Sequence, residues 1–512
     1  MSVSDVARLY HRETSQRPGN GLRAGLSGFV PMDPGNRPES FKRYPQARIH
    51  PLIQDLPARG APAAAALSGR VPPDGTVDRE LLSRLLFFSA GVTRVAAGAG
   101  ETVWFRAAAS AGNLHPLEVY VAAGDRSGLD AGLYHFAPDV FGLEELSPGD
   151  CRALVAEVVA DPQVAQSPLV LIITGVPWRT AWKYGERGWR HVYWDAGTLL
   201  ANLLTVAEGY ALQAKVLLGF IDSALCRLLG IDGVAEFPVA VVTVGGAVAS
   251  SRDGGCREPE PATTELPSAP VEFPLSTRLQ QAGNLSTAEQ VAAWRAAAAA
   301  GLPQAQGSVA PPAAANTEPI ESVVLRRGST RRMRRDIAPT ELLHWPMALA
   351  TRHLPADAIP HGATLLSHRI AVHAVQNMTA GLYHWVDGVA QLHRAVPESE
   401  VRQLSRRLCL DQPLGGDSAY TDFACVDLDQ VLGRYGDRGY RLAQLEAGVA
   451  AGRLQLAAFT LGRGGTGLTF FDQEISAVFD TPAACMLTIS IGTPAYRAKP
   501  GGPPGRPTQL TG

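Results

Sequence analysis

The chain has 512 residues, of which 46% are hydrophobic and 18% are charged, and its 46 basic and 48 acidic side chains leave a formal net charge of −2. At roughly 150 residues per domain this length predicts two to four domains, and the apolar content is sufficient for packed cores, which excludes a short disordered adaptor. The balanced charge provides no long-range field for a nucleic-acid backbone, so no nucleic-acid partner is expected.

Neither membrane insertion nor secretion is indicated. No apolar run reaches the roughly 18 uninterrupted residues of a membrane span, because the best candidate, residues 199–212, contains Glu208 and is preceded by Asp195. The N-terminal segment MSVSDVARLYHRET lacks the basic and apolar regions of a signal peptide. We therefore expect a soluble, cytoplasmic protein with no membrane partner.

The cysteines are dispersed singly, with no CxxC pair and no histidine at ligand spacing. They are Cys151, Cys226, Cys256, Cys409, Cys425 and Cys485. This pattern predicts no metal site, no iron–sulfur cluster and no disulfide scaffold. Lysine is rare, with only Lys42, Lys183, Lys215 and Lys499, so a lysine inside a motif is conspicuous.

The first half of the chain combines helical and strand patterns. Leucines at helical spacing in residues 79–88 predict an amphipathic helix. Short β-branched runs bounded by Gly or Pro predict buried strands at 117–123, 169–175 and 237–245. Residues 195–212 predict a helix so apolar that it must be buried on most sides.

Composition changes near residue 250. Residues 251–319 contain CREPEPATTELPSAP and SVAPPAAANTEP on either side of one predicted helix, which a capping box at Ser286 and Glu289 would open. We interpret this stretch as a linker between an N-terminal domain, residues 1–250, and a C-terminal domain, residues 320–512.

The second half repeats the first. It has helical patterns at 340–350 and 446–462 and a strand pattern at 485–492. Four strings recur in the same order, displaced by 249 to 251 residues: GLYHF and GLYHW, KYGERGWR and RYGDRGYR, DAG and EAG, and FID and FFD. Because each copy contains one very apolar helix, we expect these two helices to pack against each other.

The string SAGNLHP comes immediately before a predicted strand in the first half. Its small residues allow the backbone to approach a ligand, and Ser110, Asn113 and His115 can exchange hydrogen bonds with it. An ordinary turn capped by Ser and Asn would have the same composition. The matching stretch of the second half keeps Gly362 but loses the serine, the asparagine and the His-Pro pair.

The string KYGERGWR contains Lys183 and Tyr184. Either side chain can act as a general base or acid if burial or neighbouring cations lower its pKa. The alternative is a basic loop with a packed tyrosine. In the second copy the lysine is replaced by Arg434, which cannot act as a base near neutral pH, so proton transfer would belong to the first copy.

The second half opens with LRRGSTRRMRRD, residues 325–336. Arginines around a serine can bind a phosphate, although a solvated basic helix start would look alike. The first half has no equivalent cluster. A ligand site built from this cluster and the SAGNLHP turn would need both halves, so we expect one such site per chain.

Gly462, Gly464 and Gly467 spell GxGxxG, the fingerprint of dinucleotide binding when it follows a strand and opens a helix. Here it follows a predicted helix and precedes LTFF, so we interpret it as a helix-to-strand turn.

Taken together, YHRET, FKRYP, SAGNLHPLEVYV, GLYHF, KYGERGWR with DAG, and RRGSTRR resemble the SagB-type flavin dehydrogenases of the nitroreductase superfamily. The resemblance covers nearly the whole chain outside the linker. It implies an α+β fold in which two tandem nitroreductase-like domains form an intramolecular pseudodimer with FMN at the interface. Ala109 departs from the family, which usually has proline before Ser-Ala-Gly.

The resemblance also implies which residues hold the cofactor. Arg327, Ser329 and Arg331 would hold the FMN phosphate and ribityl chain. Ser110, Gly112 and Asn113 would contact the flavin from the other half. Arg497 and Lys499 are candidates for a further basic residue near the C-terminus.

The implied reaction converts thiazoline or oxazoline rings to thiazole or oxazole in a ribosomally made peptide that a partner cyclodehydratase has already cyclised. Lys183 would be the base and Tyr184 its positioning or proton-relay partner. Two alternatives remain: an NAD(P)H-dependent reductase of nitro or quinone compounds, and a flavin-free scaffold subunit of a peptide-modifying complex. Whole chains could also associate into homo-oligomers.

Overall fold

The computed structural model describes residues 5–17, 32–98, 102–247, 255–256, 263, 271–296 and 301–510. The helices of the first half are α1 (Asp5–Thr14), α3 (Ala63–Leu67), α4 (Arg79–Ala90), α5 (Arg152–Val158), α6 (Pro177–Tyr184), α7 (Gly188–Gly209) and α8 (Asp222–Leu229). Its strands are β1 (Ile49–Pro51), β2 (Val92–Ala97), β3 (Thr102–Arg106), β4 (Leu117–Ala123), β5 (Gly132–Ala137), β6 (Gly142–Pro148), β7 (Leu169–Gly175), β8 (Ala214–Leu217) and β9 (Phe237–Val244).

After α9 (Pro274–Ala282) and α10 (Ala288–Ala296), the second half begins. Its helices are α11 (Ile320–Arg326), α12 (Glu341–Ala350), α13 (Glu398–Leu408), α14 (Pro413–Asp417), α15 (Leu428–Tyr435), α16 (Arg438–Thr460) and α17 (Asp472–Val478). Its strands are β10 (Met333–Arg334), β11 (Ser367–Val372), β12 (Gly381–Val386), β13 (Val389–Ala395), β14 (Tyr420–Val426), β15 (Gly464–Leu468), β16 (Ala484–Pro494) and β17 (Thr508–Leu510).

Each half has its own antiparallel sheet. The first has the order β1-β6-β5-β4-β7-β9-β8, and the second has the order β10-β16-β14-β11-β12-β13 with β15 also paired to β16. All residues of the central strands β4, β7 and β14 are buried, which explains their runs of β-branched and apolar residues. The predicted strands and helices are confirmed. The prediction of a turn at the glycine-rich string is only partly correct, because Gly462 lies between α16 and β15 but Gly464 and Gly467 belong to β15.

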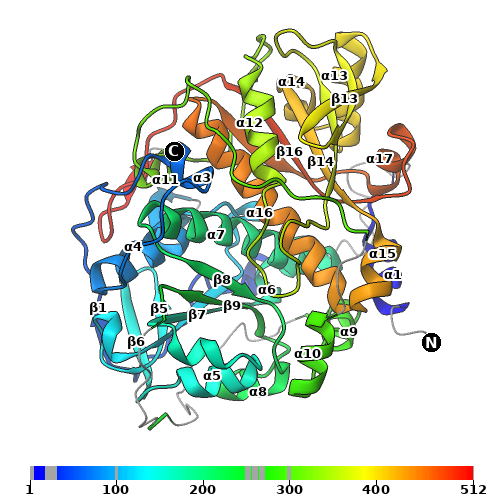
Figure 1. Ribbon diagram of the computed structural model, residues 1–512. Helices are drawn as coiled ribbons and strands as arrows, with labels where there is room; N and C mark the ends of the chain where they lie inside the picture. The colour runs from blue at the N-terminus through cyan, green and yellow to red at the C-terminus, as the bar shows by residue number, and fades with distance from the viewer. Residues whose placement is uncertain are drawn as a thin grey trace.

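Helices α7 and α16 lie between the two sheets, with the first sheet below them and the second above (Figure 1). The prediction that the two apolar helices pack together is confirmed at a glycine contact. A Cβ atom added to Gly197 would lie 2.5 Å from the Cα of Gly448, and would also meet the carbonyl oxygen of Leu445. The two glycines are 251 residues apart, so equivalent positions of the repeat touch each other.

Two buried ionic clusters join the halves in the same repeated manner. Arg187, which immediately precedes α7, and Arg190 of α7 bind Asp472 of α17, with N–O distances of 3.0 and 2.7 Å. In the other cluster, Asp222 of α8 accepts from the matching arginines of α16, Arg438 and Arg441, at 2.7 and 2.9 Å. Buried charges require such pairing, so these clusters tie each half to the other.

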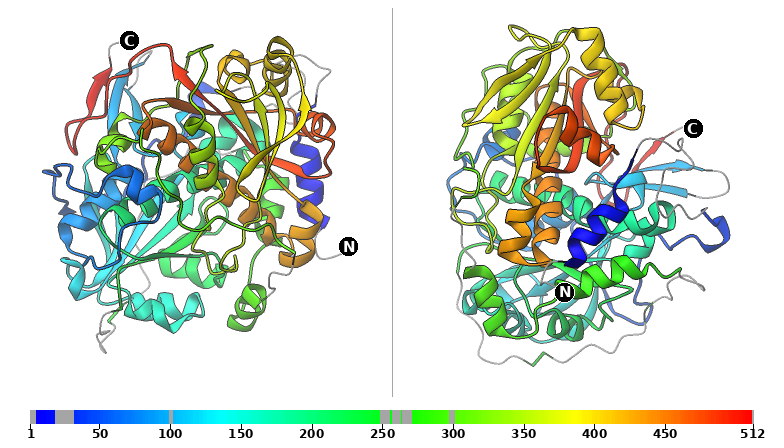
Figure 2. Two further views of the ribbon diagram at one scale, coloured as in Figure 1. Left: turned by 45° about the horizontal axis from the view of Figure 1, so that its top comes forward. Right: turned by 90° about the vertical axis from the view of Figure 1, so that its right-hand side faces the viewer.

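The two chain ends cross over to the opposite half. Helix α1 lies on the second half, where the amide of Ala7 donates to Asp437 and His11 contacts Tyr440. Strand β17 pairs in parallel with β2 of the first half, and the two lie side by side in Figure 2. The halves are therefore interlocked at both ends of the chain.

The linker differs from the sequence prediction, because the described part contains two helices, α9 and α10. The cap of α10 is also displaced by one residue from the predicted Ser286 and Glu289. Thr287 accepts from the amide of Gln290, while Gln290 accepts from the amide of Ser286. The pattern of a hydroxyl followed three residues later by Glu or Gln occurs twice in succession here, and the sequence alone did not select between them.

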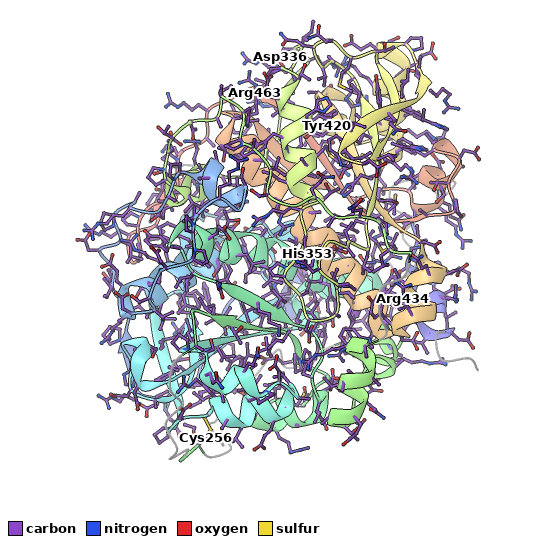
Figure 3. All side chains as sticks on the ribbon, in the orientation of Figure 1. Cys256, Asp336, His353, Tyr420, Arg434 and Arg463 are labelled. Carbon is purple, nitrogen blue, oxygen red and sulfur yellow. A yellow bond between two sulfur atoms is a disulfide. The ribbon has the colours of Figure 1, made fainter. Side chains whose placement is uncertain are left out.

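The sequence predicted no disulfide scaffold, and the described residues contain one disulfide that it did not predict. Cys151 and Cys256 form a disulfide across 105 residues, and Figure 3 shows Cys256 at the lower edge of the molecule beside α5. The bond fastens the start of the linker to the first half. Cys226, Cys409, Cys425 and Cys485 are buried free thiols.

Within the described ranges, no group of His, Cys, Asp or Glu side chains has the arrangement of a metal site. No helix there is long and apolar enough to cross a membrane.

Candidate functional site

The SAGNLHP string forms a tight turn in front of β4. Gly112, Asn113 and His115 all have positive φ angles, of 63°, 60° and 46°. Only glycine adopts this region without cost, so the two non-glycine residues must be held by their contacts. The conformation of the turn is therefore fixed by specific contacts.

The polar side chains of the turn bind the protein itself. The Ser110 hydroxyl donates to Asp195 at 2.5 Å and accepts from the His115 amide at 2.9 Å. The Asn113 amide donates to the Trp104 carbonyl oxygen at 2.7 Å, and its Oδ1 contacts the His115 ring at 2.9 Å. Ser110 and Asn113 therefore shape the turn, and its exposed backbone around Gly112 is the part left to face a ligand.

Sequence reasoning missed Asp195, which was noted only as part of the repeated DAG string. Its second carboxylate oxygen accepts from the Ala111 amide at 2.9 Å. Burial raises the pKa of Asp195 to about 7, although both hydrogen bonds favour its ionised form. Its spacing of 85 residues from Ser110 left no local signal that could have paired the two.

The catalytic candidates lie directly against this turn. Lys183 and Tyr184 end α6, where Gly185 has a positive φ of 56° that favours glycine. A Cβ atom on Gly112 would lie 2.6 Å from the Tyr184 hydroxyl and 3.2 Å from the Lys183 Nζ. The structure thus brings SAGNLHP and KYGERGWR together, and only glycine fits between them.

Their surroundings change their protonation in opposite directions. Burial lowers the pKa of Lys183, and the nearby Arg331 lowers it further. Burial raises the pKa of Tyr184 to about 12, with a further increase from Asp195. Near neutral pH the tyrosine therefore keeps its proton, while the lysine releases its proton more easily than a free lysine.

Arg327 reaches the same region from the second half. Its side chain is buried, with 5% of the residue exposed, and its Nη2 donates to the Ala107 carbonyl oxygen at 2.7 Å. Its Nε is buried without a hydrogen-bond partner among the described residues. Burial and the neighbouring Arg94 lower the pKa of Arg327 to about 9.

Arg94 and Arg327 together form an uncompensated cationic pair. Arg94 donates to the carbonyl oxygens of Lys499 and Leu325, and neither arginine has an ion pair with a carboxylate within the described part of the chain. A buried cation without a counter-charge is costly, so this position favours an anionic ligand.

The other predicted binding residues have different surroundings. Ser329 forms an isolated bridge with Gly465, beside Arg327 in the chain. Arg331 is exposed, and its amide donates to the Tyr496 hydroxyl at 3.0 Å. Arg497 and Lys499 are exposed, and the Lys499 backbone, rather than its side chain, contacts Arg94.

The second half contains a modified copy of this arrangement. Glu446, which matches Asp195, accepts from the Thr364 hydroxyl at 2.8 Å and from the Leu365 amide at 2.9 Å. A cavity of about 850 Å³ lies between the halves, lined in part by Gly69, Glu208, Arg352, His353 and His361. This copy has neither the lysine nor the SAGN turn.

The fold is a mixed α/β nitroreductase fold. Residues 73–246 match the family model described as the nitroreductase family. The crystal structure of a protein described as a nitroreductase from Anabaena variabilis is similar over 96% of this chain and 100% of that chain, with a TM-score of 0.74 and 25% identity.

Two curated proteins show more limited similarity. One named as a nitroreductase, from Methanocaldococcus jannaschii, is 29% identical over 165 residues, which are 32% of this chain and 78% of the relative. The microcin B17-processing protein McbC of Escherichia coli is 23% identical over 138 residues, which are 26% of this chain and 51% of McbC. This chain thus spans about half the length of McbC.

Proposed function

We propose that the protein is an FMN-dependent oxidoreductase that oxidises thiazoline or oxazoline rings of a ribosomally made peptide to thiazole or oxazole. The two halves would be tandem nitroreductase-like domains that form an intramolecular pseudodimer with this site at their interface. The observation that carries the proposal is the buried, uncompensated Arg327 of one half next to the SAGN turn and the Lys183–Tyr184 pair of the other.

The residues present fit the phosphate end of FMN. The unpartnered Nε of Arg327 supplies a donor where an anion is needed, and Ser329 and Arg331 lie within four residues of it. Gly112 is exposed and has no side chain, so a planar ring could approach its backbone. When bound, FMN supplies the two-electron oxidant, which accepts a hydride and is regenerated by oxygen.

The chain's own residues supply the proton chemistry. The azoline Cα–H is acidic because it lies beside an imine and a carbonyl, so a base with a lowered pKa can remove it. Lys183 has that lowered pKa and takes the proton on its Nζ. Tyr184, which stays protonated, donates a hydrogen bond that positions the ring. Oxidation removes this proton and one hydride from Cβ, and the ring becomes aromatic.

The peptide substrate is supported by the similarity to McbC, whose name assigns it to the processing of microcin B17. Since an azoline must be formed before it is oxidised, a cyclodehydratase is the expected partner. The two relatives named as nitroreductases favour the alternative of an NAD(P)H-dependent reductase.

The test is Lys183→Ala, assayed with an azoline-containing peptide by the mass loss of two hydrogens. We expect at least about a 100-fold loss of oxidation with the flavin absorbance unchanged, because a general base typically contributes this much. The control is Lys215→Ala, since Lys215 is exposed and pairs with Asp161 at 3.0 Å.

Three results would contradict the proposal. Full activity of Lys183→Ala removes the lysine from the mechanism. Rapid bleaching of the flavin by NADPH without oxygen, with no peptide oxidation, favours the reductase. A purified protein that binds no flavin favours the scaffold subunit.

A further inference from the structure

Three anchors outside the turn fix its conformation. Trp104 of β3 accepts from Asn113, and Arg179 of α6 donates to the His115 carbonyl oxygen at 3.2 Å. The third anchor is Asp195 of α7, which takes the Ser110 hydroxyl and the Ala111 amide together. Asp195 binds the two residues that immediately precede Gly112, so it fixes the position at which the positive-φ part of the turn starts.

A buried carboxylate such as Asp195 lowers the stability of the folded protein, which is unfavourable for a purely structural residue. It is 4% exposed and has no ion pair with a cation among the described residues, although it accepts two hydrogen bonds. Burial disfavours its charged form, which is the physical cause of its raised pKa. A residue that costs stability where function is expected is typical of a functional site.

We propose that Asp195 is the positioning residue of the SAGN turn, residues 110–113. Its two carboxylate oxygens fix Ser110 and Ala111 and so hold Gly112 against Lys183 and Tyr184. In this role Asp195 acts through Ser110 and Ala111 of the turn. The role of the turn in holding flavin rests on the function proposed above, whereas its dependence on Asp195 does not.

The repeat provides a matched control. Glu446 holds Thr364 and Leu365 by the same pair of bonds, in a half that lacks the SAGN turn. Both carboxylates are buried, and burial raises the pKa of each. Asp195→Asn and Glu446→Gln therefore remove equivalent charges from equivalent helices, and only the first should affect the site.

The first measurement is hydrogen exchange of the amides of residues 110–115 in protein stripped of flavin. Asp195 accepts from Ser110 and from Ala111 on two different oxygens, and Asn replaces one of these oxygens by an NH2 donor. We expect Asp195→Asn to exchange at least about tenfold faster in this segment, the effect of losing a hydrogen bond to a charged group, and Glu446→Gln to stay within about twofold of the parent.

The second measurement is the affinity for FMN, titrated by the quenching of its fluorescence. Asp195→Asn should bind at least about tenfold more weakly, while Glu446→Gln should bind as the parent does. If Asp195→Asn does not fold, Ser110→Ala replaces it, with Ser110→Thr as the rescue because threonine makes this bond in the second half.

Each outcome decides one point. Unchanged exchange in Asp195→Asn, or equal effects in both carboxylate variants, overturns the positioning role. Faster exchange with unchanged FMN affinity also overturns it, because the turn then does not serve the flavin. If the parent itself binds no FMN, the proposed function fails, and the exchange comparison still shows whether Asp195 holds the turn.

Discussion

Arg327 shows how one buried charge can identify a ligand. The cationic form of a guanidinium whose pKa is lowered by burial is disfavoured in the folded protein, so at neutral pH it reduces the free energy of unfolding. An anion bound beside Arg327 would stabilise the charged guanidinium and so raise the free energy of unfolding.

Replacing Arg327 with Met should weaken FMN binding about 100-fold, the upper range for lost hydrogen bonds to a charged group. The flavin-free variant should melt at the same or a higher temperature than the parent, because an uncompensated buried cation has been removed. Flavin fluorescence and thermal melts check both results. The control is Arg334→Met, since Arg334 is exposed on β10; an equal loss of affinity in this control would contradict a specific role for Arg327.

The protonation of Lys183 predicts a pH profile. In the mechanism proposed above the neutral form of Lys183 would be the base, so kcat should rise with pH through a value below 10.5, the ordinary pKa of lysine. Since Arg331 lowers this pKa by repelling the charged form, Arg331→Gln should raise it and move the profile to higher pH. Rates measured from pH 6 to pH 10 test this shift, and an unmoved profile would show that another group titrates.

At the scale of elements, the contact between α7 and α16 sets the distance between the halves. Gly197 and Gly448 allow the two helix backbones to meet directly, and Trp189 stacks on Tyr440, its repeat equivalent, with ring centroids 5.9 Å apart. Any side chain at the glycine contact must therefore push the helices apart.

Gly197→Ala should reduce the free energy of unfolding by about 1–3 kcal/mol, because overpacking exceeds the gain in helix propensity. Gly433→Ala is the matched control, since Gly433 is also helical and an added Cβ atom there meets nothing within 4 Å. Urea unfolding should show the control to be unchanged or more stable by up to about 1 kcal/mol. A Gly197 variant as stable as the control would mean that the helices can separate without cost.

The sequence predicted these elements well and their long-range contacts poorly. The bounds of β4 and β7 agree with the prediction, because their apolar runs end at Gly or Pro. The bond between Asp195 and Ser110, and the pairing of Cys151 with Cys256, depend on how distant segments meet, which no local pattern encodes. The three motifs were found from the sequence, but the use of Ser110 and Asn113 within the turn was not.

At the scale of the whole molecule, the two halves are joined by charges that neither half satisfies alone. Asp472 binds Arg187 and Arg190 of the first half and accepts a hydrogen bond from the amide of Gln16. Removing its charge would leave these arginines buried and unpaired.

Asp472→Asn should lower the free energy of unfolding by about 3–5 kcal/mol, the usual cost of breaking a buried ion pair. Glu474→Gln, two residues further along α17, should cost less than about 1 kcal/mol, because its partner Arg407 is exposed. Urea denaturation of both variants provides the comparison. Equal losses would indicate that the cluster does not contribute to joining the halves.

The crossing of the chain ends has a consequence for how the two copies could diverge. If the halves were separate products, the first would lack the strand that β17 adds beside β2, and the second would lack the helix seated on Asp437 and Tyr440. In a symmetric homodimer, any substitution in one turn would also damage its twin. Because both halves belong to one chain, they are always present in a one-to-one ratio, and a substitution in one half leaves the corresponding turn of the other unchanged.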